Sequence, residues 1–314
     1  MAKVFRIDKK LPITWQEALQ SFLSWKQAQG VAPLTLRDYR LHITRFFKKF
    51  PDAYHPHLVR ERVLAYMSEP LMPASFNRRR QYLLAFFSWA VREGIFPQNP
   101  LHDIHSKRDK GTIRHQPEEV LKNLLELPNK TTFTGLRDYA LILLMISTGI
   151  RPGEALALLP QHVNLKALTI VVERTVAKTR VERILPLDPR VASALEALLK
   201  ARHPAWDEKV PVFCTWEGRP LRVNDWDKRM EKYGKKLGMK ITPYQLRHSF
   251  ATLALKSGAN AFAIQAIMGH SDLRMTLRYV HLLESDLREA MMKSNPLNRI
   301  MHPRGRVGKV QNRH

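Results

Sequence analysis

A polar, basic stretch near the end of the first third of the chain constrains the fold more than any other feature. It reads HDIHSKRDKGTIRH, has no hydrophobic period, and follows Asn99-Pro100. Such a segment does not pack into a core, so we expect a linker over residues 101–116. A chain of 314 residues is long enough for a separate core on each side of it. The sequence therefore predicts two domains, at residues 13–100 and 117–300.

The segment before the linker has the periodicity of amphipathic helices. Its apolar residues recur three and four positions apart in four successive stretches. Thr14 is placed to cap the first helix, and Gly94 is placed to end the fourth. The predicted helices span residues 14–30, 33–50, 59–67 and 75–93. Together they predict a compact four-helix domain.

The segment after the linker combines helices with two short strands. Residues 136–147 are apolar nearly all round, which indicates a buried helix. Residues 168–175 and 183–187 have the composition of strands joined by a hairpin turn. We therefore expect a mainly α protein with a small β-hairpin, in which a helical domain precedes a mixed α/β, mostly helical one. Residues 301–314 are basic and contain no acid, and we expect a flexible tail there.

The charge of the chain favours a polyanionic partner. Its 52 Lys and Arg residues against 28 Asp and Glu residues give a net charge of +24. Such a surface binds phosphate backbones by releasing counterions, although a merely basic protein remains an alternative. The candidate DNA contacts lie at the start of the fourth helix and in the linker; they are Arg78, Arg79, Arg80, Lys107 and Arg108. For the arginine triplet, a solvated helix face is the competing interpretation.

Several classes of protein are disfavoured by what the sequence lacks. No apolar run approaches the roughly 18 residues of a membrane span. The first residues, MAKVFRIDKK, do not form a secretory signal, so we expect a cytoplasmic protein. Cys214 is the single cysteine and favours a buried apolar role, while the histidines show no zinc spacing. We expect no metal and no cofactor.

Four short segments after the linker contain residue types suited to phosphate chemistry. Arg151 lies in TGIRPGE just past the buried helix, and Lys178 lies in the predicted hairpin turn. Arg247 lies in YQLRHS, and His270 ends MGH, with Tyr279 nine residues later. Taken singly, each residue has a commoner structural role, such as a helix cap or a half-buried aromatic ring. Only the ordered set indicates a catalytic site.

The chemistry of a phosphodiester explains why these types belong together. Its transition state spreads negative charge over the equatorial oxygens, and the planar fork of arginine donates two parallel hydrogen bonds to them. A tyrosine hydroxyl can attack phosphorus if its proton is accepted as it moves. The covalent phosphotyrosine keeps the energy of the broken bond, so rejoining needs neither ATP nor a metal.

In this order the segments resemble the tyrosine recombinases of the phage integrase family, in their compact two-domain form. The family pattern is an arginine in a TGxRxxE box, a lysine in a hairpin turn, HxxRH and LGH boxes, and a tyrosine about nine residues later. The resemblance covers residues 14–300 and implies a core-binding domain that clamps DNA, followed by a catalytic domain of the DNA breaking-rejoining type. It implies that Tyr279 forms a 3′-phosphotyrosyl intermediate, with Lys178 protonating the leaving 5′ oxygen and His270 binding the phosphate.

One position departs from the family pattern. The first histidine of the HxxR box is Tyr244 here. A phenol is a poor base near neutral pH, so the acceptor of the nucleophile's proton stays open, although we still expect a site residue there. In the hairpin, Arg180 and Arg183 compete with the lysine for its role. We expect Glu154 to brace the arginine region and His248 to be a packing or hydrogen-bonding residue.

The resemblance also implies an assembly and a biological role. It implies a homotetramer on two double-stranded DNA sites, held by a C-terminal segment near residues 295–301, for integration, excision or resolution of a mobile DNA element. Two other classes stay open. A type IB topoisomerase would use the same chemistry on DNA of any sequence, and a DNA-binding regulator could keep the fold without catalysis.

Overall fold

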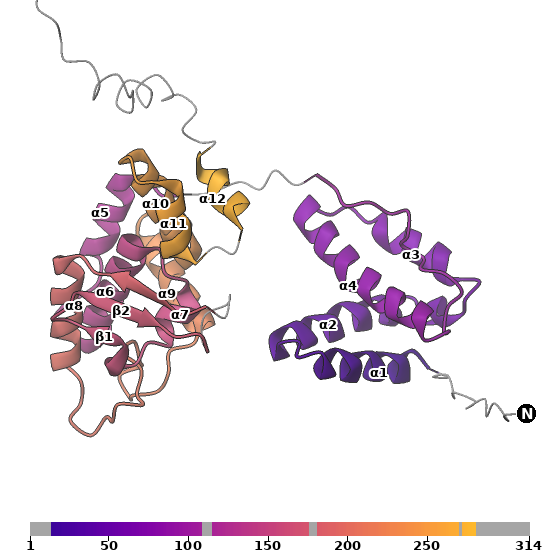
Figure 1. Ribbon diagram of the computed structural model, residues 1–314, viewed down its shortest axis with the longest axis horizontal. Coiled ribbons are helices and arrows are strands. Elements are labelled where there is room, and N and C mark those ends of the chain that lie inside the picture. Colours follow the sequence, from indigo (N-terminus) through magenta and orange to yellow (C-terminus); the bar gives the residue numbers. More distant parts are fainter. Residues whose placement is uncertain (1–13, 109–114, 176–180, 270–271, 281–314) are drawn as a thin grey trace, which may run out of the picture. The chain divides into compact units, whose positions relative to one another are not determined.

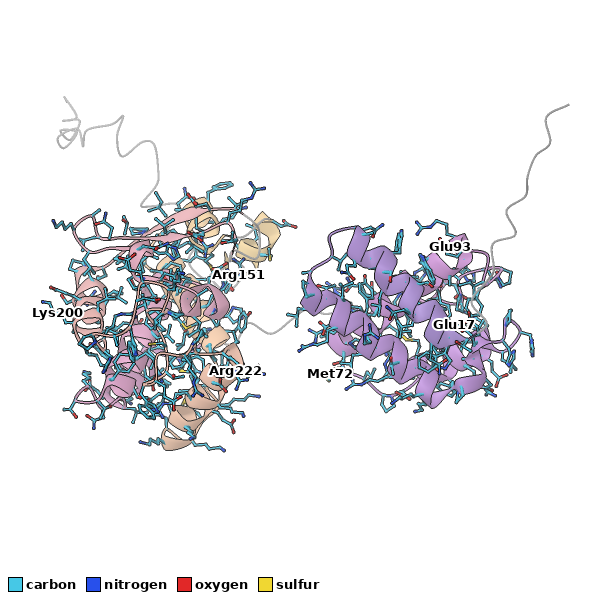
Figure 2. All side chains as sticks on the ribbon, turned by 90° about the horizontal axis from the view of Figure 1, so that it is seen from below. Glu17, Met72, Glu93, Arg151, Lys200 and Arg222 are labelled. Carbon is cyan, nitrogen blue, oxygen red and sulfur yellow. The ribbon has the colours of Figure 1, made fainter. Side chains whose placement is uncertain are left out.

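The chain divides into two compact units, residues 1–112 and 113–314 (Figure 1). Each unit packs its side chains around its own core (Figure 2). Helices dominate both, which confirms the expected mainly α fold class with a small sheet. None of the described helices has the length and apolar character needed to cross a membrane. The computed structural model describes residues 14–108, 115–175, 181–269 and 272–280.

The first unit contains the four helices that its periodicity predicts. Thr14 caps the first through a capping box with Glu17, and prolines occupy the first positions of the second and fourth. Proline suits these positions because the first amide of a helix has no intrahelical partner to lose. The elements are α1 (Trp15–Ala28), α2 (Pro33–Lys49), η1 (Pro51–Tyr54), α3 (Val59–Met67) and α4 (Pro73–Arg92).

Aromatic rings fill the core of the first unit. Phe46, Phe47, Phe86 and Phe87 are fully buried. Phe22 on α1 meets Phe86 on α4 edge to face, with ring centroids 5.5 Å apart. Rings in this arrangement add a favourable quadrupole contact to the burial of their area. They join α1, α2 and α4 into one block.

The second unit is also mainly helical and contains a three-stranded antiparallel sheet in the order β1-β2-β3. The predicted hairpin strands are confirmed as β2 and β3, with Ile170 opposite Leu185. The short strand β1 and several helices of this unit, α5, α8 and α9 among them, were not predicted. The elements are α5 (Glu118–Glu126), α6 (Phe133–Thr148), α7 (Pro152–Leu156), η2 (Pro160–His162), β1 (Val163–Asn164), β2 (Thr169–Val172), β3 (Arg183–Pro186), α8 (Pro189–Lys200), α9 (Val223–Lys236), α10 (Pro243–Lys256), α11 (Ala261–Met268) and α12 (Leu273–Val280).

The buried helix α6 organises the second unit, because it packs against both α8 and α10. It ends at Gly149, whose φ of 61° is in the left-handed region. A Cβ there would lie 2.3 Å from the ring of Phe250 on α10. Glycine is therefore required for α6 to stop against α10 and for the chain to turn into α7.

A buried charged cluster fixes α6 to α9. The carboxylate of Asp138 is fully buried and accepts hydrogen bonds from Arg137 at 2.6 Å and from the Tyr233 hydroxyl at 2.7 Å. Arg229 also donates to it, at 2.5 Å. Burial and the neighbouring carboxylate raise the pKa of Tyr233 well above its ordinary value, so its hydroxyl stays protonated. The cluster is compensated internally and holds the framework around the site.

Candidate active site

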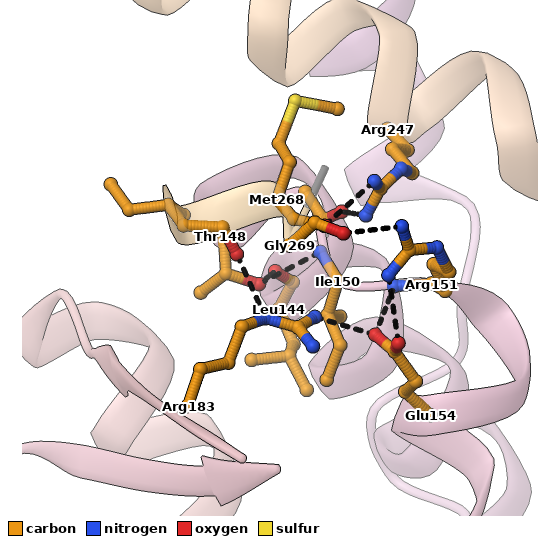
Figure 3. Close-up of polar contacts among 11 residues, drawn as sticks. Leu144, Thr148, Ile150, Arg151, Glu154, Arg183, Arg247, Met268 and Gly269 are labelled. Atoms are coloured by element: carbon orange, nitrogen blue, oxygen red, sulfur yellow. Dashed lines mark hydrogen bonds and ion pairs between the residues drawn. The ribbon is translucent and has the colours of Figure 1, made fainter. Parts of the chain in front are cut away.

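Arg151 lies where α6 gives way to α7. Gly149 turns the chain, and Arg151 is the N-cap of α7. Its Nη1 donates to Glu154 Oε1 at 2.9 Å, and its Nη2 donates to the carbonyl of Gly269 at 2.7 Å. The guanidinium is therefore held from two sides (Figure 3).

Glu154 braces two arginines, as expected, although the second of them was not foreseen. Its other oxygen accepts a hydrogen bond from Arg183 Nη2 at 2.5 Å, and Arg183 Nε donates to the carbonyl of Ile267 at 3.0 Å. Burial opposes ionisation of Glu154, but the hydrogen bonds and charges of Arg183 and Arg151 hold its pKa below the ordinary value. A buried carboxylate thus links β3 to the start of α7.

Arg247 enters the same region from α10 and is 4% exposed. Its Nη1 donates to the carbonyl of Gly149 at 2.5 Å, and its Nη2 donates to that of Met268 at 2.8 Å. Burial, followed by the nearby charge of Arg151, lowers the pKa of Arg247 to about 10. The guanidinium therefore remains charged at neutral pH.

Two helix ends orient this pair of arginines. Gly149 ends α6 and Gly269 ends α11, both in the left-handed conformation. The carbonyls left over at a helix C-terminus form its negative pole, and here they accept hydrogen bonds from Arg151 and Arg247 (Figure 3). Within the described part of the chain, these side-chain contacts use two of the five N–H donors of each guanidinium. The remaining donors can bind phosphate oxygens.

Tyr279 lies on α12, which packs against α10 and α11. It is 4% exposed and belongs to an apolar cluster with Leu255, Ile264 and Met268. Its hydroxyl is 2.6 Å from Nδ1 of His248. His248 directly follows Arg247 on α10, and Met268, whose carbonyl accepts a hydrogen bond from Arg247, belongs to the same apolar cluster as Tyr279.

A comparison with protein families agrees with this arrangement. Residues 115–286 match the family described as the phage integrase family. The chain belongs to that family. The assignment places it among enzymes that cleave and rejoin DNA strands.

Similar curated proteins cover nearly the whole length of this family member. The tyrosine recombinase XerC of Thermodesulfovibrio yellowstonii is 30% identical over 286 residues, which is 87% of this chain and 94% of that protein. The tyrosine recombinase XerD of Lacticaseibacillus casei is 28% identical, covering 85% and 94%.

Solved structures share the fold of this chain. A lambda integrase dimer bound to a COC′ core site has a TM-score of 0.69 at 19% identity, covering 84% of this chain and 97% of that one. The Tn1549 transposon integrase in complex with transposon right end DNA has a TM-score of 0.67 at 21% identity, covering 83% and 94%. These likenesses establish the fold.

The structure brings together some of the predicted site residues. Arg151 and Arg247 both donate to carbonyls at the C-terminal end of α11, and Tyr279 belongs to the same apolar cluster as Met268 of that helix. Lys178 and His270 lie outside the described residues. Tyr244, in the first turn of α10, is 52% exposed and lines an open cleft with Asp227 and other residues of α9.

The candidate DNA contacts of the first unit have different surroundings. Arg79 donates to the carbonyl of Tyr66 and to Glu69, and Arg80 donates to the carbonyl of Ile104. Arg78 is exposed and lines a hollow that also contains Arg45 and His42. Lys107 and Arg108 are exposed as well, and the Lys107 ammonium lies 4.2 Å from the ring centroid of Phe76.

Two residues of the site were missed or undervalued by sequence reasoning. Arg183 was considered only as a rival to the hairpin lysine, yet it supports Glu154 and the end of α11. His248 was expected to pack or to form a hydrogen bond, and its partner proves to be the Tyr279 hydroxyl. The sequence offered a signal for His248, because it lies one helical turn after Tyr244 and so on the same face of α10.

Proposed function

We propose that this enzyme is a site-specific recombinase in which Tyr279 attacks a DNA phosphate and becomes joined to the 3′ end of the cut strand. The observation that supports this most is that Arg151 and Arg247 both donate to carbonyls at the C-terminal end of α11, while the Tyr279 hydroxyl contacts His248, the residue after Arg247. Two fixed guanidiniums beside a phenol are suited to stabilise the charge of a pentacoordinate phosphate. The phosphotyrosyl link conserves the energy needed to reseal the strand.

The remaining roles follow from the family resemblance. Lys178 protonates the departing 5′ oxygen, and His270 donates a hydrogen bond to the phosphate. Tyr244 is exposed at the start of α10, and there its hydroxyl can contact DNA near the cut. The reaction needs no ATP and, with cations already in place around the phosphate, no metal.

The first unit and the linker would hold duplex DNA against the site. Arg78, Lys107 and Arg108 are exposed cations and are the better candidates for phosphate contacts. Arg79 and Arg80, which are bonded within their own unit, would support that surface. We propose that residues 13–100 form the clamp, residues 101–116 the linker and residues 117–300 the catalytic domain.

The assembly that we propose is a tetramer on two recombination sites. Its contacts would come from the segment near residues 295–301, which lies outside the described residues. Acting on DNA in the cytoplasm, such an assembly would integrate, excise or resolve a mobile element.

The test begins with a library of nicked duplexes of random sequence, because a nick beside the cut lets the short 5′-hydroxyl fragment diffuse away and traps the adduct. Duplexes that become bound to the protein in EDTA and resist detergent are amplified and sequenced. We expect a defined sequence, an adduct on the peptide that contains Tyr279, and no adduct with Tyr279→Phe.

Three outcomes would overturn the proposal. Cleavage that requires a metal and leaves no adduct would exclude the phosphotyrosyl route. Relaxation of supercoiled plasmids that lack the selected sequence would indicate a topoisomerase. Sequence-specific binding without any adduct would indicate a regulator.

A further inference from the structure

We propose that His248 accepts the proton of the Tyr279 hydroxyl during strand cleavage. This inference rests on the function proposed above and fills the position left open by Tyr244. It assigns His248 a catalytic role, since it contacts the reacting oxygen.

The geometry suits a proton transfer. The Tyr279 hydroxyl oxygen and His248 Nδ1 are 2.6 Å apart, which is a short hydrogen bond. In the neutral tautomer that carries its proton on Nε2, Nδ1 presents a lone pair to that hydroxyl. An imidazole with an ordinary pKa near 6.5 is a competent base at neutral pH.

Tyr244 fits this duty less well. It is a phenol with the same intrinsic basicity as the nucleophile, so transferring a proton to it brings no driving force. Its side chain is also 52% exposed, whereas Tyr279 is 4% exposed. His248 lies one helical turn further along the same face of α10, toward the buried nucleophile.

Packing holds the pair in place. The ring of Tyr279 belongs to the cluster formed by α10 and α11, and the His248 ring is tilted by 42° against it at 5.7 Å. His248 becomes an imidazolium as Tyr279 bonds to phosphorus, and Lys178 loses its charge in the same reaction, so the total charge of the site is unchanged. The fixed cation of Arg247, the residue before His248 on α10, favours negative charge as it develops on the Tyr279 oxygen.

The O–H bond of Tyr279 breaks as its oxygen forms a bond to phosphorus, and the proton moves to His248 Nδ1. The bond from phosphorus to the 5′ oxygen breaks, and that oxygen takes a proton from Lys178. In rejoining, the 5′ hydroxyl attacks the phosphotyrosine and returns its proton to Lys178, while His248 returns its proton to the departing phenolate.

The test measures the single-turnover rate of adduct formation on the duplex selected above. Asparagine can keep a hydrogen bond to the tyrosine but cannot take its proton. We expect His248→Asn to slow cleavage by about 10²- to 10⁴-fold while DNA affinity stays unchanged. His203→Asn, at an exposed histidine outside the site, should match the wild type.

A modified substrate separates the acid from the base. If sulfur replaces the bridging 5′ oxygen, the leaving thiolate, whose conjugate acid has a pKa of about 8.5, needs no proton donor. Lys178→Ala should then cleave at nearly the wild-type rate, whereas His248→Asn should stay slow. Added imidazole should restore cleavage by the His248→Ala variant, and among substituted imidazoles the restored rate should vary with their pKa.

The possible failures are distinguishable. If the wild type gives no adduct that depends on Tyr279, the proposed function itself fails. If the wild type forms the adduct and His248→Asn forms it equally fast, only the role of His248 is wrong. Should the asparagine variant not fold, a wild-type cleavage rate on the sulfur substrate that does not fall between pH 8 and pH 5 would equally refute a base of this kind.

Discussion

The two units of this enzyme bury different kinds of side chain. The core of the first unit is apolar and aromatic, whereas the buried charged side chains of the described residues lie in the second. They are Arg137, Asp138, Glu154 and Arg247. Burying a charge costs several kcal/mol unless it is paired, so each of these has a partner that offsets the cost. The first unit is thus held by apolar packing, while the second also holds charged side chains in fixed positions.

That difference separates stability from activity. Replacing an aromatic residue of the first core should weaken folding without changing the chemistry of folded molecules. Replacing a buried charge near the helix ends of the second unit should both weaken folding and slow the reaction. The hydrogen bonds that compensate such a charge also orient it toward the site.

The largest expected effect in this comparison is that of the substitution Arg247→Lys on the rate of strand cleavage. A lysine keeps the charge but not the fork that bonds the carbonyls of Gly149 and Met268 while facing phosphate. Cleavage should slow by about 10³-fold, which corresponds to about 4 kcal/mol in the barrier. Single-turnover adduct formation measures it. Phe86→Leu in the first core is the matched control, and an equal loss of rate there would remove the distinction between the units.

A smaller effect is expected from Glu154→Gln, which leaves Arg151 and Arg183 without their shared carboxylate. Breaking such a buried pair should lower the free energy of unfolding by about 3 kcal/mol at pH 7. Cleavage should slow as well, because Arg151 loses one of its two anchors. Urea unfolding and the adduct assay measure the two effects.

The same carboxylate gives this stability difference a pH dependence. The pKa of Glu154 is held below its ordinary value of 4.5, so its contribution is complete above that pH and is lost as the pH falls through the lowered value. Arginine stays charged throughout this range. The stabilities of the wild type and of Glu154→Gln should therefore approach each other as the pH falls from 4.5 through the lowered pKa. A difference that stayed constant down to pH 3 would show that folding does not lower the pKa of this carboxyl group.

The sequence predicted the first unit better than the second for a physical reason. Thr14, the prolines at the helix starts and Gly94 are local signals, and their helices formed as predicted. The order of the charged residues, which matches the family pattern, suggested the site, but order along the chain carries no distances. Arg183 and His248 took their roles from contacts with Glu154 and Tyr279, which are 29 and 31 residues away in the chain. Such contacts arise only once the fold is formed.

The smallest effect concerns two neighbouring arginines of α4. Arg79 is paired with Glu69, lies over the ring of Tyr66 at 3.8 Å and has a side chain only 14% exposed. Arg78 is exposed and forms no hydrogen bond or ion pair with any residue that the structure describes. Arg79 is therefore a largely buried and paired charge, like those of the second unit, although it lies in the apolar first unit. Arg78 belongs to the exposed basic surface.

The variants Arg78→Ala and Arg79→Ala test whether paired and exposed charges differ in role even between two neighbouring residues. Arg78→Ala should leave stability within about 0.5 kcal/mol, weaken DNA binding several-fold and reduce the salt dependence by about one counterion. Arg79→Ala should instead lower stability by about 1–2 kcal/mol, because it removes a partly buried pair and its contact with an aromatic ring. Fluorescence anisotropy on the selected duplex at several salt concentrations, together with urea unfolding, measures both. If Arg78→Ala lowered stability and Arg79→Ala weakened DNA binding, burial and pairing would not distinguish the arginines that support this fold from those that bind DNA.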